Sequence, residues 1–248
     1  MKETSRRCGR EGMHKRVLIT GCGRSGTKYI SILLGRCGLE IVHERRMGKD
    51  GISSWLFGAE SLTAPWGPSP ANYSFEHTFH LIRNPLSAIP SIATFRPAAW
   101  KYISGHISID SSDSLILRSA KYWLYWNGMV ENKTDIRLKI EDMPGAIAIL
   151  YNRVGAQSDI SSIKQVHKDL NTRRYGNLFN IFESTCLDVG LVRNNAFLKK
   201  LLSKLPPMYE DLTWKDLGVL DPSLTEKIYN KALKYGYDYP TSVAGIRG

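Results

Sequence analysis

The alternation of apolar and polar positions predicts strands and helices in turn along most of the chain. Residues 17–20 form a short apolar run before Gly21, which is typical of a buried strand. Over residues 25–37, apolar side chains recur at helical spacing, which predicts an amphipathic helix that ends at Gly38. Residues 39–43 predict a second strand. This succession indicates the beginning of a parallel α/β sheet flanked by helices.

The same pattern continues through the middle of the chain. Residues 58–74 are rich in proline and glycine and are predicted to form a loop. Alternating segments at 77–82 and 135–140 predict a third and a fourth strand, and the apolar periodicity of 112–132 predicts a long helix between them. After about residue 150 the pattern is mainly helical, so we expect a helical C-terminal portion.

Composition and length favour one folded domain. The chain has 248 residues, of which 42% are hydrophobic, and this is enough to form a core. Residues 1–15 are predicted to be a basic, mobile tail and residues 16–248 a single domain. The sequence contains neither an apolar run of about 18 residues nor a secretory signal in its first sixteen positions. Its four cysteines lack CxxC spacing, so we expect a reducing, cytoplasmic setting without a membrane span.

The charge of the chain points to an anionic partner. Lys and Arg number 34 against 23 Asp and Glu, a net charge of +11. Six basic and two acidic residues lie in the first sixteen positions, so the rest of the chain remains strongly basic. A nucleotide, a nucleic acid, an acidic glycan or a phosphate compound would suit this charge.

The loop at residues 21–28 is the main candidate for phosphate binding. It lies between a predicted strand and helix, where unpaired N–H groups and the helix dipole attract anions. A P-loop NTPase would need Lys directly after Gly26, but the order here is Thr27-Lys28. The spacing of Gly21, Gly23 and Gly26 also fits an NAD(P)-binding Rossmann loop, with Glu44 near the position of the ribose-binding acid.

The segment from Cys22 to Thr27 resembles the 5′-phosphosulfate loop of sulfotransferases that use 3′-phosphoadenosine 5′-phosphosulfate (PAPS). That loop has a basic residue followed by Ser-Gly-Thr at the end of the first strand, as here. The resemblance implies a P-loop NTPase-like fold in which cationic side chains take the place of a metal ion. It also implies that the donor is held by Gly23, Arg24, Ser25, Gly26, Thr27 and Lys28.

A second segment resembles the 3′-phosphate motif of the same family. Arg83 ends the predicted third strand, Asn84-Pro85 follows, and Ser91 lies eight residues after the arginine. An arginine fork and a hydroxyl are suitable donors for a phosphate dianion. Because Pro90 lies inside the expected helix and predicts a kink there, Ser87 is the alternative hydroxyl.

The resemblance is weaker in the rest of the chain. The predicted helix around residues 121–127 and the segment 137–143 are similar to the long helix and a strand end of these enzymes. Arg173 and Arg174 lie about where the family has a late nucleotide-binding loop. A basic surface loop is an equal interpretation of this pair.

The general base is expected at the end of the second strand. His43 and Glu44 are adjacent there, and the resemblance favours Glu44, with His43 as the alternative. Since neighbouring strand residues point to opposite faces, we expect only one of the two to face the donor. The glycines of 47–55 predict a loop over the site, and Trp55 is expected to be either a core residue or a stacking platform.

These features lead to three hypotheses of function. The first is a metal-free sulfotransferase that moves a sulfuryl group from PAPS to a hydroxyl of a glycan, a tyrosyl residue or a small molecule. The basic charge favours an acidic glycan or peptide as acceptor. The alternative is an NAD(P)-dependent oxidoreductase. A basic nucleic-acid-binding module is the third, but no nucleic-acid motif is recognised in the sequence, so nucleic acid is not expected as a partner.

Overall fold

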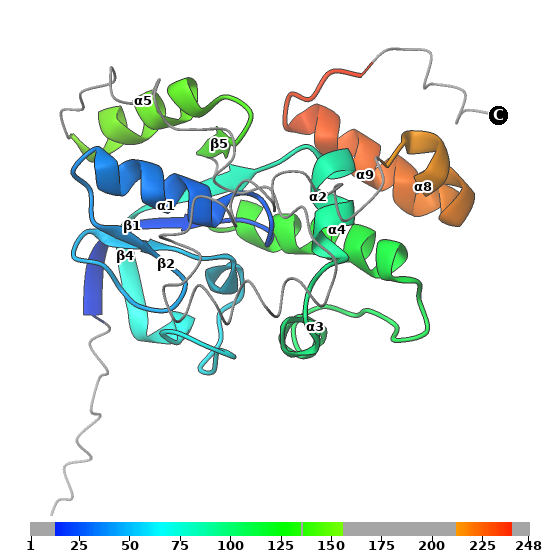
Figure 1. Cartoon of the computed structure of the whole chain (residues 1–248), viewed down its shortest axis with the longest axis horizontal. Coiled ribbons are helices and arrows are strands. Elements are labelled where there is room, and N and C mark those ends of the chain that lie inside the picture. Colours follow the sequence, from blue (N-terminus) through cyan, green and yellow to red (C-terminus); the bar gives the residue numbers. More distant parts are fainter. Residues whose placement is uncertain (1–12, 135, 156–211, 240–248) are drawn as a thin grey trace, which may run out of the picture.

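The computed structural model describes residues 13–134, 136–155 and 212–239, and these form a parallel β-sheet flanked by helices (Figure 1). This confirms the predicted α/β class. The five strands lie in the order β2-β3-β1-β4-β5, and every neighbouring pair is parallel. They are β1 (Met13–Thr20), β2 (Ile41–His43), β3 (Gly51–Ser53), β4 (Tyr73–Ile82) and β5 (Arg137–Lys139).

Seven α-helices and two short 3-10 helices are present in the described ranges. The α-helices are α1 (Thr27–Arg36), α2 (Pro85–Ile92), α3 (Pro97–Ser104), α4 (Leu115–Glu131), α5 (Met143–Val154), α8 (Trp214–Leu220) and α9 (Pro222–Lys234). The 3-10 helices are η1 (Trp55–Gly58) and η2 (Pro70–Asn72). None of these helices is both long and apolar enough to cross a lipid bilayer.

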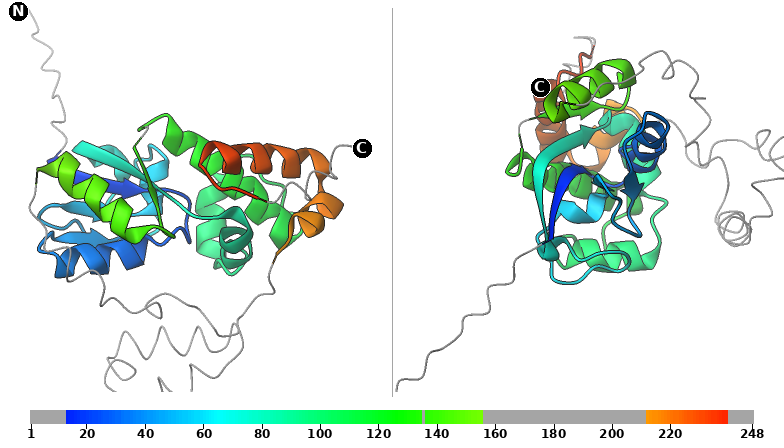
Figure 2. Two further views of the ribbon diagram at one scale, coloured as in Figure 1. Left: turned by 90° about the horizontal axis from the view of Figure 1, so that it is seen from above. Right: turned by 90° about the vertical axis from the view of Figure 1, so that its left-hand side faces the viewer.

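The sheet separates two hydrophobic clusters, as the alternation of side chains along β1 requires. Val17 and Ile19 belong to the cluster formed with α1 and α5. Leu18 belongs to the cluster that contains α2, α4, α8 and α9. In the left view of Figure 2, α1 and α5 lie on one side of the picture and α8 and α9 on the other.

The segment predicted as a loop over the site contains a strand of the sheet, so this prediction was wrong. β3 lies between β2 and β1, with Val17 opposite Gly51 and Ile19 opposite Ser53. A Cβ at Gly51 would lie 1.9 Å from the carbonyl oxygen of Val17. Glycine is therefore needed here for a close backbone approach within the sheet and does not mark a loop.

The third and fourth predicted strands are present with different limits. β4 begins at Tyr73, because its first residues pair with the beginning of β1, and so the loop predicted for 58–74 ends earlier than expected. At the other end of β4, the side chain of Asn84 accepts a hydrogen bond from the amide of Leu86 and caps α2, with Pro85 in the first turn. α2 continues through Pro90 to Ile92.

The aromatic residues of α4 form the centre of the larger cluster. Tyr122, Trp123 and Trp126 are fully buried, and Trp55 packs against Trp126 with ring centroids 5.5 Å apart. The indole N–H of Trp126 also donates to the carbonyl of Trp55. Trp55 is thus a core residue, the first of the two roles expected for it.

Candidate functional site

The glycine loop connects β1 to α1 in the way that the sequence predicts. A Cβ at Gly23 would lie 2.3 Å from the ring of Phe95, so no larger residue fits without movement of that ring. Gly26 is the N-cap of α1 and has a left-handed backbone with φ of 97°. The backbone therefore makes a tight turn that ends at the N-terminus of a helix.

This helix end has the properties of an anion site. The amides of the first turn of a helix have no intrahelical acceptor, and their dipoles favour negative charge. The first turn of α1 contains no acidic residue, and Gly26 supplies no capping side chain. Lys28 is exposed in the same turn, whereas Ser25 and Thr27 are buried.

Two side chains of helix α4 hold the loop by accepting hydrogen bonds from its backbone amides. The amide of Gly23 donates to the hydroxyl of Tyr122 at 2.7 Å, and the amide of Cys22 donates to Oδ1 of Asn127 at 3.3 Å. Nε2 of His80 lies 2.9 Å from the same Oδ1. Since Oδ1 is an acceptor, Nε2 of His80 carries the proton and donates to it.

Burial keeps the side chains of Cys22 and His80 neutral. It raises the pKa of the Cys22 thiol to about 11, although hydrogen bonds to Ser25 and Asn127 oppose the shift. Burial also lowers the pKa of His80 to about 4, against the opposing hydrogen bond to Asn127. A protonated Cys22 is a weak nucleophile, so these groups support the loop and do not react.

Folding stability should therefore decrease in mildly acidic solution because of His80. Its pKa is lower in the folded protein than the ordinary 6.5, so below that pH the unfolded chain binds the proton more readily. The linkage lowers the free energy of unfolding by about 2 kcal/mol between pH 7.5 and pH 5. Urea unfolding at both pH values should show this difference between the wild type and His80→Gln. Equal pH dependence in the two proteins would contradict it.

The two predicted phosphate motifs lie next to each other. Nη1 of Arg83, at the end of β4, donates to the backbone carbonyl of Arg24 at 3.0 Å. The two residues are far apart in the sequence, but they follow β4 and β1, which are neighbours in the sheet. The indole N–H of Trp123 donates to the carbonyl of Arg83 at 3.3 Å, so α4 also supports this second motif.

The side chain of Arg24 extends toward the segment after α2. Its Nη2 donates to Oγ1 of Thr94 at 2.9 Å, and its Cζ lies 4.9 Å from the centre of the Phe95 ring. The hydroxyl of Thr94 in turn donates to the carbonyl of Ser91 at 2.8 Å. Ser91 is buried, and the alternative hydroxyl, Ser87, is exposed. This connection joins the first motif to the second through Thr94.

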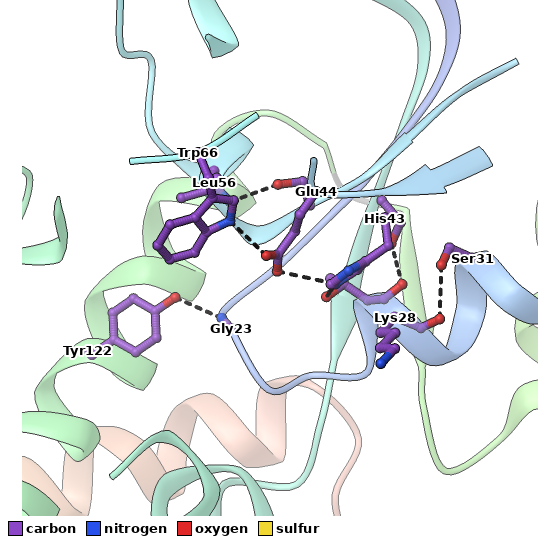
Figure 3. A network of polar contacts seen from close by, with 11 residues as sticks. Gly23, Lys28, Ser31, His43, Glu44, Leu56, Trp66 and Tyr122 are labelled. Atoms are coloured by element: carbon purple, nitrogen blue, oxygen red, sulfur yellow. Dashed lines mark hydrogen bonds and ion pairs between the residues drawn. The ribbon is translucent and has the colours of Figure 1, made fainter. Parts of the chain in front are cut away.

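The expectation that the side chains of His43 and Glu44 point to opposite faces is wrong, because the two side chains are in contact (Figure 3). Nε2 of His43 lies 3.2 Å from Oε1 of Glu44 and 3.2 Å from Oγ1 of Thr27. β2 ends at His43, and Glu44 has a positive φ of 50°, which turns its side chain back toward the loop. The rule of alternating faces therefore no longer applies at Glu44.

A tryptophan that the sequence analysis did not single out holds the other oxygen of Glu44. Nε1 of Trp66 donates to Oε2 at 2.8 Å. Burial alone would raise the pKa of Glu44, but His43, Trp66 and the charge of Arg24 outweigh it and lower the pKa below its ordinary value. The carboxylate is consequently ionised at neutral pH and available to accept a proton.

Replacing Trp66 by Phe should raise the pKa of Glu44. The ring is retained, but the lost hydrogen bond to a charged group is worth about 1.5–3 kcal/mol, or at least about one pH unit in the titration midpoint. A ¹³C NMR titration of the Glu44 carboxyl group measures this midpoint. Trp214→Phe, a change in α8, is the control and should leave the midpoint where it is. An unchanged midpoint in Trp66→Phe would contradict the assigned role of the indole.

Arg24 and Glu44, whose side chains make these polar contacts, also have strained backbones. Among the non-glycine residues in the described ranges, only Arg24 and Glu44 have a positive φ, of 72° and 50°. Such conformations cost about 1–3 kcal/mol and tend to occur at functional sites. The strain and the polar contacts thus indicate the same location.

The last described segment of the chain also contacts the edge next to Arg83. The hydroxyl of Tyr239 donates to Oδ1 of Asn84 at 3.2 Å, and the hydroxyl of Tyr237 donates to Oε2 of Glu141 at 2.9 Å. Oε1 of Glu141 accepts from the amide of Asn84 at 2.8 Å. Residues that follow β4, β5 and α9 are therefore linked at this edge.

The structure thus brings together most of the residues that the sequence predicts for the site. The loop residues 23–28, Arg83 and the pair His43 and Glu44 lie around the ends of β1, β2 and β4. Arg173 and Arg174 lie outside the described residues. No group of three or more His, Cys, Asp or Glu side chains arranged to hold a metal ion occurs in the described part of the chain.

The comparisons with known proteins do not extend this description. The chain matches no protein-family model, no curated protein and no solved structure.

Proposed function

We propose that the chain is a PAPS-dependent sulfotransferase with the P-loop-like architecture of that family. The observation that carries this proposal is the hydrogen bond from Arg83 to the carbonyl of Arg24. It unites a cationic helix N-terminus and a second arginine at one edge of the sheet. A nucleotide with anionic groups at both ends would require such a pair of sites.

The residues present fit the donor. The amides of residues 26–28, with Arg24 and Lys28, would hold the 5′-phosphosulfate, and Arg83 with Ser91 would hold the 3′-phosphate. PAPS supplies a sulfuryl group on an activated bridging oxygen. Arg24, Lys28 and the helix dipole would stabilise the negative charge that develops on that oxygen as its bond to sulfur breaks.

Glu44 would act as the general base. Its carboxylate takes the proton from the acceptor hydroxyl, whose oxygen then forms the new bond to sulfur, while the electron pair of the broken bond leaves with 3′-phosphoadenosine 5′-phosphate (PAP). His43 and Trp66 would orient this carboxylate through the contacts to its two oxygens. His43 remains the alternative base.

The strand order favours this proposal over an NAD(P)-dependent oxidoreductase. In the common dinucleotide-binding order, the strand after the first helix pairs directly with the first strand. Here β3 lies between β2 and β1.

Calorimetric titration with PAP in the absence of Mg²⁺ tests the proposal. We expect PAP to bind the wild type. The dissociation constant of Arg83→Ala should be roughly 10- to 100-fold larger, because a pair of charge-assisted hydrogen bonds is lost. Arg36→Ala, an exposed change in the last turn of α1, is the matched control and should bind as the wild type does.

Three results would overturn the proposal. PAP could bind Arg83→Ala as tightly as the wild type, or bind only when Mg²⁺ is added. NADPH could also raise the unfolding temperature where PAP does not, which would favour the oxidoreductase.

A further inference from the structure

The first residues of the loop between β1 and α1 use their amides within the protein. The amide of Gly23 donates to the hydroxyl of Tyr122 in α4, and the amide of Ser25 donates to the carbonyl of Cys22 at 3.2 Å. An anion at the N-terminus of α1 would therefore meet the later amides of the loop and the side chain of Arg24. The conformation of the first part of the loop decides where that side chain lies.

The hydrogen bond from Ser25 to Cys22 closes a β-turn in which Arg24 occupies the third position. The φ of Arg24 is 72°, and a positive φ at this position is a property of type II turns, where glycine is favoured. A residue with a side chain is strained there because its Cβ crowds the backbone. Contacts from elsewhere in the fold must therefore hold the arginine in this conformation.

Tyr122 makes such a contact directly before the strained residue. Its side chain is fully buried, and its hydroxyl accepts from the amide of Gly23 at 2.7 Å (Figure 3). Burial raises the pKa of Tyr122 well above its ordinary value of 10, so the hydroxyl stays neutral. The rings of Trp55, Phe95 and Trp126 lie around the Tyr122 ring, with centroids 5.2 to 6.1 Å away, and fix its place.

Phe95 and Arg83 complete the surroundings of Arg24. Phe95 packs against Tyr122 with ring centroids 5.9 Å apart, and Cζ of Arg24 lies 4.9 Å from the centre of the same Phe95 ring. The carbonyl of Arg24 accepts from Nη1 of Arg83. Hydrogen bonds thus fix the peptide group before Gly23 and the peptide group after Arg24, and the direction of the guanidinium follows from this backbone.

We infer that Tyr122 is a positioning residue, which holds Arg24 at positive φ and so places its guanidinium at the candidate anion site. The identity of the anion, the 5′ end of PAPS, rests on the proposed function, but the conformational role of Tyr122 does not. A residue that acts only through Arg24 cannot weaken ligand binding by more than the loss of Arg24 does. It also has no effect on the ligand once Arg24 is absent.

NMR spectroscopy of Tyr122→Phe tests the conformational role without a ligand. The variant keeps the ring and removes only the hydroxyl. An amide proton lies closer to its own Hα at positive φ, so the strong intraresidue NOE of Arg24 should weaken, and hydrogen exchange of the Gly23 amide should be roughly tenfold faster. Tyr102→Phe removes another hydroxyl next to Trp55 and is the matched control, which should change neither.

Calorimetric titration with PAP tests the connection to the ligand. We expect the dissociation constant of Tyr122→Phe to be roughly 3- to 10-fold larger than that of the wild type, and smaller than that of Arg24→Gly. The double variant should bind PAP as Arg24→Gly does. Glycine adopts the positive φ without help, and no guanidinium is left to be positioned.

Thermal unfolding gives a third measurement, which also applies if Tyr122→Phe folds poorly. The change should lower the unfolding temperature less in Arg24→Gly than in the wild type, because glycine is not strained at this position. An equal loss in the two backgrounds would contradict the inference.

Two further results would overturn it. One is an unchanged NOE and an unchanged exchange rate in Tyr122→Phe. The other is an equal weakening of PAP binding by Tyr122→Phe with and without Arg24, because such additivity is typical of sites that act independently. If PAP binds none of these proteins while the NMR and unfolding results are as expected, the proposed function fails and the role of Tyr122 is retained.

Discussion

Replacing Glu44 by Gln is expected to lower kcat by about 10²- to 10⁴-fold, the usual contribution of a general base. The amide has nearly the same shape and can still accept the hydrogen bond from Trp66 and donate to His43. It cannot take a proton from the acceptor. The rate is measured as release of PAP from PAPS in the presence of glycan, tyrosyl-peptide and small-molecule hydroxyl compounds as acceptors.

His43→Gln is the control for this prediction. If Glu44 is the base, losing the imidazole removes only an orienting contact, and kcat should fall less than in Glu44→Gln. A larger loss in His43→Gln would instead identify His43 as the base. PAP affinity should be retained in both variants, because neither residue is among those assigned to the nucleotide.

Replacing Arg24 by Gly is expected to lower kcat by about 10²- to 10³-fold, as when one well-placed donor to a developing oxyanion is removed. Glycine adopts the φ of 72° found at this position without strain. The variant therefore loses the guanidinium and its contacts to Thr94 and Phe95, but the turn of the loop is preserved.

Thermal unfolding distinguishes a catalytic effect from a structural one. The unfolding temperature of Arg24→Gly should stay close to that of the wild type, because relief of backbone strain offsets the lost contacts. Thr94→Val, which removes the acceptor of the guanidinium but keeps the charge, should show a smaller loss of kcat. Full activity of Arg24→Gly would exclude Arg24 from the chemistry.

The part of the fold that the sequence predicts best is the unit from β1 to β2. An apolar run, three glycines and an amphipathic helix each have a local signal, and Asn84-Pro85 marks the start of α2 in the same way. Strand β3 has only three residues and begins with glycine, so it lacks any periodic pattern. Its place in the sheet depends on pairing with β1, which lies about 30 residues earlier in the sequence, as well as with β2.

The polar contacts of the site are less predictable for a related reason. Glu44 meets His43 because its backbone is held at a positive φ, and this conformation is stabilised by the tertiary structure and not by the local sequence. Trp66 lies in a segment rich in proline and glycine, where no period indicates which way a side chain points. Asn127 could have been recognised from the sequence, because it is a polar residue on the buried aromatic face of a helix.

The contacts of Tyr237 and Tyr239 with Glu141 and Asn84 have a consequence for the order of assembly. Asn84 directly follows Arg83, so the edge that is proposed to bind the nucleotide is completed by residues more than 150 positions later in the chain. A nascent chain that lacks them could form the first loop but not the finished edge. By thermodynamic reciprocity, a nucleotide that needs this edge would also hold α9 in place, and amide hydrogen exchange in α9 should slow when PAP binds.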